Sequence, residues 1–241
     1  TRVRSSAASD VYKRQVYDTP TFRADRSEHA ARQSNQHERY ARALASLQAA
    51  GLVFPCRCTR RDVAMRVPHQ PGEEPCYPGT CRNAAVPPGE SYARRVRLDP
   101  FIAAFDDLRL GPIVHEPARQ CGDLLVRDRH AQWTYQFAVV VDDQAHDIDV
   151  VIRGEDLLAS TGRQLQLAAL LGRTRPQRFL HHALLVHPDG SKLSKATHDT
   201  ALRDMRAAGA RPEALLAEAA RRAGLAQRHT LPVTAIAELF G

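Results

Sequence analysis

The sequence has no long apolar segment. In a chain of 241 residues, no apolar run approaches the ~20 residues that span a bilayer. The first residues also have no apolar core of the kind that secretion signals carry. These absences argue against a membrane partner and predict a soluble cytoplasmic protein. With 43% apolar residues, the chain can bury one substantial core and a smaller appended module.

Cysteine is scarce and unevenly distributed. Of five cysteines, two lie in Cys56–Cys58 and two in Cys76–Cys81, which leaves Cys121 apart. Nothing in the sequence indicates an oxidising compartment, so disulfides are not expected. Paired thiols separated by a loop suit tetrahedral zinc, which stabilises a segment too loop-rich to have its own core. We therefore expect one structural zinc, with free buried thiols as the alternative.

Acidic residues are outnumbered by basic ones. The chain has 34 lysines and arginines against 27 acidic residues, a net charge of +7 and a pI near 9.5. This balance favours a polyanionic partner such as nucleic acid, although many basic chains are merely basic. The segment Tyr92–Leu98 is consistent with a strand that presents three arginines to nucleic acid, or with a solvated edge strand.

Two apolar runs predict buried strands. Phe137–Val141, which two aspartates end, reads as a strand buried on both faces, and Asp149–Ile152 reads as a second. Ser160 or Thr161 can then cap a helix that ends at Gly172. The Leu165, Ala168, Ala169 and Leu171 side chains of that helix would share its apolar face. Strand, polar turn and helix together predict an α/β fold.

Three further helices are predicted from apolar stripes and capping residues. Ser34 or Asn35 can cap the first, whose stripe consists of Tyr40, Ala43, Leu44 and Leu47 before Gly51 ends it. Pro212 opens the second, with an inward face made of Leu215, Leu216 and Ala219. The third runs from about residue 232 to 239.

A lysine-rich loop follows the turn His187–Gly190. Lys192 and Lys195 flank a serine, so that two ammonium groups can stabilise negative charge that shifts on a triphosphate. The same short string also occurs in solvated surface loops. In open parallel sheets ligands lie beyond the carboxyl ends of the strands, where Tyr135 and Arg153 would meet this loop.

Three ordered segments carry a resemblance to a known family. Trp133–Asp143, Val151–Leu158 and Lys192–Lys195 stand in the order and approximate spacing found in class I glutamyl-type aminoacyl-tRNA synthetases, which the chain resembles from about residue 33 to 201. The resemblance implies an α/β, Rossmann-like class I synthetase catalytic domain with a small zinc-binding insertion and a helical carboxyl end.

The resemblance also implies a division of the chain. Family members open with a His-x-Gly-His-like signature that binds ATP, and this sequence has none, so we expect a catalytic domain incomplete at its amino terminus and an inactive chain. The expected parts are a leader outside the native fold (1–15), a partial nucleotide-binding fold (16–55), a zinc-binding module (56–98), the remaining catalytic fold (99–190), and the lysine loop with terminal helices (191–241).

Site residues follow from the matched motifs. The resemblance implies that Tyr135 and Arg153 bind glutamate, that Lys192 and Lys195 are catalytic, and that Lys195 binds ATP, which is used with Mg. Its zinc pattern maps onto Cys56, Cys58, Tyr77 and Cys81. Ligand softness instead favours the Cys76 thiolate over a phenol as the fourth ligand, so both remain open. His181 aligns with a family histidine near the nucleotide, or it is a packed core histidine.

The short carboxyl end selects among family members. Only about 45 residues follow the lysine loop, too few for the anticodon-binding region of full glutamyl-tRNA synthetases. The resemblance is therefore to shortened relatives that activate glutamate with ATP and transfer it to the queuosine base in the anticodon of tRNA(Asp). A monomer is expected. The alternatives are a fragment of a full glutamyl-tRNA synthetase and a non-catalytic, zinc-bearing RNA-binding module.

Overall fold

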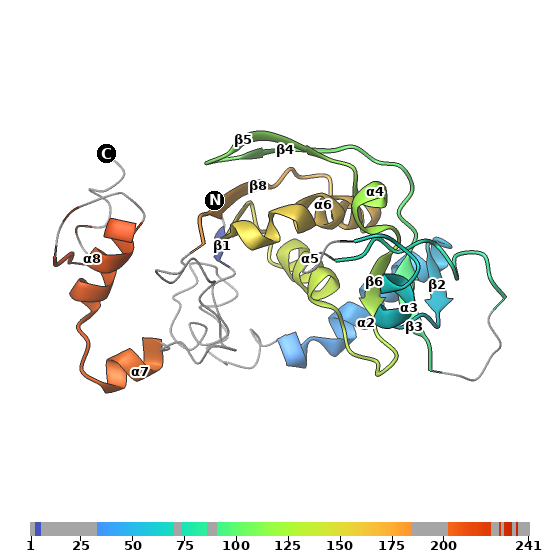
Figure 1. The fold of residues 1–241 in the computed structure, drawn as a ribbon, viewed down its shortest axis with the longest axis horizontal. Coiled ribbons are helices and arrows are strands. Elements are labelled where there is room, and N and C mark those ends of the chain that lie inside the picture. The colour runs from blue at the N-terminus through green and yellow to red at the C-terminus, as the bar shows by residue number, and fades with distance from the viewer. Residues whose placement is uncertain are drawn as a thin grey trace. The chain divides into compact units, whose positions relative to one another are not determined.

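The structure is a computed structural model that describes residues 3–5, 33–69, 74–85, 91–184, 202–222, 227, 229–232 and 235. The chain divides into two compact units, Thr1–His182 and Ala183–Gly241. Figure 1 shows the helices and strands of each. Among the helices of the described ranges, none combines the length and the apolar composition needed to cross a bilayer.

A mixed sheet forms the frame of the first unit. Within the described residues its strand order is β1-β7-β8-β4-β5. The first four strands are parallel to their neighbours, and β5 pairs antiparallel with β4. Their bounds are β1 Val3–Ser5, β4 Ala103–Asp107, β5 Gly111–His115, β7 Val150–Gly154 and β8 Arg178–His182. The strand predicted at Asp149–Ile152 is confirmed as β7. Contrary to expectation, part of the leader joins this sheet, as β1.

Helices are layered behind this sheet. Helix α6 (Thr161–Leu170) contacts β4 and β5, and α5 (Tyr135–Ala145) contacts α6. Helix α5 also contacts strand β6 (Leu124–Arg127) of a second, small sheet that is described below. In Figure 1 these two helices lie together below β4, β5 and β8. Helix α2 (His37–Ala49) packs on α5 in turn. Most of the buried apolar side chains of the unit lie between these helices and the small sheet.

The run Phe137–Val141 is helical, so the prediction of a strand is wrong. All five of its side chains are buried, and so is Asp143. A helix buried on every side shows the same unbroken apolar run as a buried strand, and periodicity cannot separate the two. The aspartates do not end the element. Asp142 lies inside α5 and accepts hydrogen bonds from the Tyr40 hydroxyl (2.7 Å) and Arg39 (2.9 Å) of α2.

The predicted helix boundaries are largely confirmed. Helix α2 buries Tyr40, Leu44 and Leu47 and is followed by Gly51 at a φ of 71°. Its N-terminus differs from the prediction, because a 3-10 turn, η2 (Gln33–Asn35), precedes it and no side chain caps it. Helix α6 likewise has no side-chain cap, since the 3-10 helix η3 (Glu155–Ser160) leads straight into it.

The apolar face predicted for α6 is only partly right. Ala168 is buried and Leu165 and Leu171 are half-buried, but Ala169 is exposed. Gly172, at a φ of 83°, follows the helix as predicted. Polar side chains occupy much of the buried face, including Thr161 and Gln164. An apolar stripe does not predict such positions, because a buried polar side chain depends on hydrogen-bond partners from other elements of the fold.

A second, smaller antiparallel sheet has the order β2-β3-β6. Its strands are β2 Val53–Cys56, β3 Ala93–Val96 and β6 Leu124–Arg127, with the short helices α3 Arg60–Ala64 and α4 Pro117–Cys121 nearby in sequence. The strand predicted in Tyr92–Leu98 is confirmed, but it is the middle strand and not an edge. The Arg95 guanidinium donates to the Asp123 carbonyl (2.7 Å) and that of Arg97 to the Arg82 carbonyl (2.7 Å).

The second unit is described only in part. It contains α7 (Leu202–Ala207) and α8 (Pro212–Arg222), and α8 begins at the predicted proline. Ala217 and Ala220 form its buried face with Leu231, whereas Ala219, which was predicted to point inward, is exposed. The lysine loop and most of the helix predicted over 232–239 lie outside the described residues.

Candidate functional site

Arg153 is the most deeply buried charged group among the described residues of the sheet. It lies on β7, its relative exposure is 0%, and each of its three guanidinium nitrogens donates a hydrogen bond. The partners are His181 Nε2 (3.0 Å), Gln164 Oε1 (2.6 Å) and Thr161 Oγ1 (2.6 Å). Three fixed bonds define the plane of the guanidinium, which is the property that bidentate recognition of a carboxylate requires.

His181 sits beside Arg153 on the neighbouring strand β8 and is also fully buried. Burial lowers the pKa of His181, the Arg153 charge lowers it further, and the hydrogen bond to Asp107 opposes both. His181 Nδ1 lies 2.6 Å from Asp107 Oδ2. Its full burial and its hydrogen bonds agree with the second of the two predicted roles, that of a packed core histidine.

A chain of hydrogen bonds leads from Arg153 to Gln136 on helix α5. Gln164 accepts from Arg153 and donates through Nε2 to Gln136 Oε1 (2.6 Å). Gln136 in turn donates to Ser160 Oγ (2.9 Å). Gln136 follows Tyr135, the first residue of α5, so this polar chain reaches the first turn of that helix.

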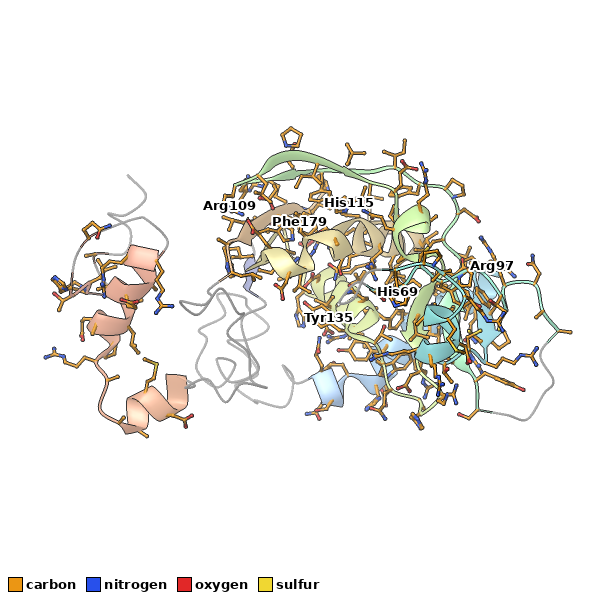
Figure 2. The ribbon with its side chains drawn as sticks, viewed as in Figure 1. His69, Arg97, Arg109, His115, Tyr135 and Phe179 are labelled. Carbon is orange, nitrogen blue, oxygen red and sulfur yellow. The ribbon has the colours of Figure 1, made fainter. Side chains whose placement is uncertain are left out.

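Tyr135 itself faces outward. Its relative exposure is 42%, and Figure 2 labels it at the α5 helix. Tyr135 is therefore not a core side chain. An exposed phenol at the start of a helix can hydrogen-bond a ligand, whereas the buried Arg153 can supply charge from below the surface.

Three cysteines of the small sheet converge. The ligand atoms of Cys56, Cys58 and Cys81 all lie within 4.8 Å of one another, and Cys76 is not in this group. Cys58 Sγ and Cys81 Sγ are 3.6 Å apart, which is too far for a disulfide. The Tyr77 hydroxyl joins the cluster, 3.5 Å from Cys56 Sγ, and accepts a hydrogen bond from the Cys81 amide (2.8 Å).

The donor set fits zinc. A tetrahedral site with ~2.3 Å metal–sulfur bonds places its sulfurs about 3.8 Å apart, close to the observed spacing. Burial raises the pKa of Cys58 to about 11, and hydrogen bonding to Cys81 adds to the effect. For Cys81, burial is outweighed by hydrogen bonds from the Arg57 amide and the neighbouring groups, so its pKa is lowered. Zinc requires thiolates and would draw the protons from such a cluster.

Local structure fixes the approach to the cluster. Cys56 ends β2, and Thr59 immediately after Cys58 caps α3 with a reciprocal pair of bonds to Asp62 (3.1 and 2.7 Å). The backbone of Tyr77 is held by the α4 turn, where the Tyr77 amide donates to the Cys121 carbonyl (2.9 Å). Gly122 has a φ of 64°, and a Cβ there would lie 2.1 Å from the Tyr77 carbonyl oxygen.

We therefore expect Gly122→Ala to destabilise the fold by about 2–4 kcal/mol, because the left-handed backbone and a backbone clash are penalised together. Gly79→Ala is the matched control, since Gly79 has a φ of 76° and nothing within 4 Å of the added carbon. It should cost only about 1 kcal/mol. Urea unfolding of both variants measures the difference. Equal losses would mean that the Tyr77–Gly122 contact does not constrain the cluster.

Two of the predicted site residues lie outside the described residues, and three residues that were not predicted belong to the site. Lys192 and Lys195 lie outside the described residues. Asp107, Gln136 and Gln164 were not predicted from the sequence, although they complete the hydrogen bonding around Arg153. Asp107 contacts a residue 74 positions away, so no local motif signals it. The one available clue was the polar face of α6, where glutamines recur among apolar residues.

Comparison with known proteins decides the family. The model of the class I tRNA synthetases (E and Q), catalytic domain, matches residues 8–234. The chain belongs to this family. The prediction of a class I synthetase α/β fold is thus confirmed, and the match begins earlier than the predicted start near residue 33.

Individual relatives within the synthetase family carry one name. The chain is similar to the glutamyl-Q tRNA(Asp) synthetases of Geobacter sulfurreducens (41% identity over 166 residues) and Aromatoleum aromaticum (45% over 166). These alignments cover 68% of this chain and 52% and 51% of the relatives. The Burkholderia mallei protein of the same name is 41% identical, and that alignment covers 80% of this chain and 65% of the relative. The chain thus spans about half the length of the first two relatives.

Solved structures agree on the synthetase fold. A glutamate-tRNA synthetase from Elizabethkingia anophelis superposes with a TM-score of 0.53 at 23% identity, covering 74% of this chain and 38% of its own. A glutamate tRNA ligase from Elizabethkingia meningosepticum, solved with its amino acid, gives a TM-score of 0.54 at 23% identity, with 74% and 37% covered. At this identity the likeness concerns the fold alone.

Proposed function

We propose that this chain, when joined to the family's His-x-Gly-His-like signature, activates glutamate with ATP and transfers it to the queuosine base in the anticodon of tRNA(Asp). The observation that carries the first half is the buried Arg153 guanidinium, which three hydrogen bonds hold in a fixed plane. A fixed guanidinium is suited to a carboxylate substrate. The acceptor is inferred from the relatives, which share 41–45% identity and are named for tRNA(Asp).

The proposed chemistry has two steps. The α-carboxylate of glutamate attacks the α-phosphorus of ATP, the bond to the β-phosphate breaks, and pyrophosphate leaves. A hydroxyl of queuosine then attacks the activated carbonyl and loses its proton, while AMP leaves. Arg153 and Tyr135 bind and orient glutamate, and Lys195 with Lys192 stabilises charge on the phosphates. ATP is used with Mg²⁺, and the protein works as a monomer.

Two assays of the full-length protein, meaning this chain with a family-type amino terminus, test this proposal. Glutamate-dependent exchange of labelled pyrophosphate into ATP reports the first step. Transfer of labelled glutamate to tRNA(Asp) with queuosine, compared with the same tRNA carrying guanine at that position, reports the second. Exchange with equal labelling of both tRNAs would contradict the queuosine acceptor, and labelling of tRNA(Glu) would identify a glutamyl-tRNA synthetase. RNA binding without exchange would indicate a non-catalytic module.

We further propose a structural zinc bound by Cys56, Cys58, Tyr77 and Cys81. The short distances among these four side chains support it, and Cys76 lies outside the cluster. When bound, the metal would join β2 to the Tyr77–Cys81 loop and stabilise a segment with a small apolar core. It has no role in the reaction itself.

One equivalent of zinc per chain is therefore expected in protein purified without added metal. Tyr77→Phe should weaken zinc retention by about tenfold or more, because a ligand is lost, whereas Cys76→Ser should leave it unchanged. Elemental analysis after dialysis against a graded series of chelator concentrations measures retention. Weaker retention in Cys76→Ser alone would make Cys76 the fourth ligand, and a folded, zinc-free wild type would contradict the site.

A further inference from the structure

Asp107 is a buried carboxylate whose hydrogen bonds connect the end of β4 to the neighbouring strand β8. It ends β4 with a relative exposure of 3%. Its Oδ1 accepts from the amides of Arg109 (3.0 Å) and Leu110 (2.9 Å). Its Oδ2 accepts from the His181 amide (3.0 Å) and faces His181 Nδ1 at 2.6 Å. Three backbone amides and one imidazole nitrogen fix the carboxylate in place and keep it ionised.

Three polar groups face the His181 ring: the Arg153 guanidinium and the Thr161 hydroxyl (3.2 Å) at Nε2, and the Asp107 carboxylate at Nδ1. The hydroxyl can donate or accept, whereas the other two groups have fixed roles. The Arg153 Nε–H always donates, so His181 Nε2 must accept it. An ionised Asp107 can only accept, so His181 Nδ1 must carry the ring proton and donate it. Asp107 thereby selects the tautomer of His181, and this tautomer provides the acceptor that Arg153 needs. His181 is neutral in this arrangement.

The geometry points to Asp107 and His181 as positioning residues that orient the Arg153 guanidinium for carboxylate binding, an inference that rests on the proposed function. Gln164 and Thr161 receive one bond each from the two terminal nitrogens. The bond to His181 fixes the third nitrogen and with it the rotation of the whole plane. A long arginine side chain loses much rotamer freedom when it binds a ligand, and prior orientation removes that cost.

A matched pair of substitutions isolates this role. His181→Gln keeps an oxygen acceptor near the position of Nε2, whereas His181→Leu is of similar volume and has none. Asp107→Asn places an amide N–H₂ opposite backbone N–H donors in either orientation, so it disturbs the His181 tautomer or the Arg109–Leu110 turn. Asp106→Asn, at the exposed neighbouring position of β4, is the control.

Two measurements on the full-length protein separate positioning from a purely structural effect. Nitrogen NMR of arginine Nε–H groups reports the orientation of Arg153 without any ligand. Calorimetry reports the affinity for glutamate, with stoichiometry as a check for unfolded protein. His181→Leu and Asp107→Asn should lose the protected Nε–H resonance and bind glutamate about tenfold more weakly, at full stoichiometry. His181→Gln and Asp106→Asn should change affinity less than threefold.

The outcomes are distinct. An Nε–H resonance that survives in His181→Leu would overturn the positioning role, as would reduced stoichiometry at unchanged affinity, which indicates only misfolding. Equal glutamate affinity in His181→Leu and His181→Gln would overturn it as well. A wild type that has the protected resonance but binds no glutamate would instead contradict the proposed function while supporting the orientation of Arg153 by His181.

Discussion

Replacing Lys195 with alanine is expected to slow glutamyl-adenylate formation by roughly two or more orders of magnitude, at least ~2.7 kcal/mol of transition-state stabilisation. The reason is that an ammonium group beside the α-phosphate acts mainly when charge increases on phosphorus. Glutamate binding should therefore change little. Single-turnover formation of the adenylate, together with calorimetry of glutamate, measures both quantities.

The composition of the chain offers a clean control for this experiment. The sequence contains three lysines, Lys13, Lys192 and Lys195. Lys13→Ala removes the one lysine outside the loop and should leave adenylate formation within about twofold of wild type. Protection of Lys195 from acetylation by bound ATP gives a readout that does not depend on catalysis. Two results together would make the loop a solvated surface segment: normal adenylate formation in Lys195→Ala, and no protection of Lys195 by ATP in the wild type.

Replacing Arg153 with alanine should have two large effects. A carboxylate clamp acts in the ground state and the transition state alike, so KM for glutamate should rise by about a hundredfold with a smaller change in kcat. The structure adds a loss of folding stability of about 3–5 kcal/mol, because His181, Gln164 and Thr161 lose a buried partner together. Initial rates against glutamate concentration and urea unfolding measure the two effects.

Arg178→Ala is the control for this variant, since Arg178 is exposed at the start of β8 in the same sheet. It should change stability by less than about 0.5 kcal/mol and leave KM unchanged. Arg153→Lys keeps the charge but cannot bond three partners in one plane, so it should rescue stability only in part. A stable Arg153→Ala variant with wild-type KM would remove both the structural and the glutamate-binding role.

The sequence predicted those elements whose pattern is local. Helix α2 has a clear apolar stripe and a glycine stop, and β7 is a short apolar run before a polar turn. Helix α5 was missed because its run Phe137–Val141 is buried on all sides, so the period that distinguishes helix from strand is lost. The length of the element could still have distinguished a helix from a strand. The two aspartates after Val141 looked like the end of a short strand, but they are part of the helix.

The candidate site was predicted unevenly for a related reason. Arg153 and the three clustered cysteines belong to short motifs, and the structure brings the cysteines together. Ligand softness favoured Cys76, which lies outside the cluster of three cysteines, because softness says nothing of where the chain turns. Asp107 was invisible because its partner His181 lies 74 residues further along. Contacts of that kind are set by the order of strands in the sheet.

The polar chain from Asp107 through His181 and Arg153 to Gln164 and Gln136 crosses three strands and two helices. The free energies of substitutions along such a chain do not add, because removing one member already releases its neighbours. Asp107 and Gln136, far apart on separate elements, should therefore show coupling in a double-mutant cycle. Sequence changes that keep activity in this corner of the fold would have to arise as compensating pairs.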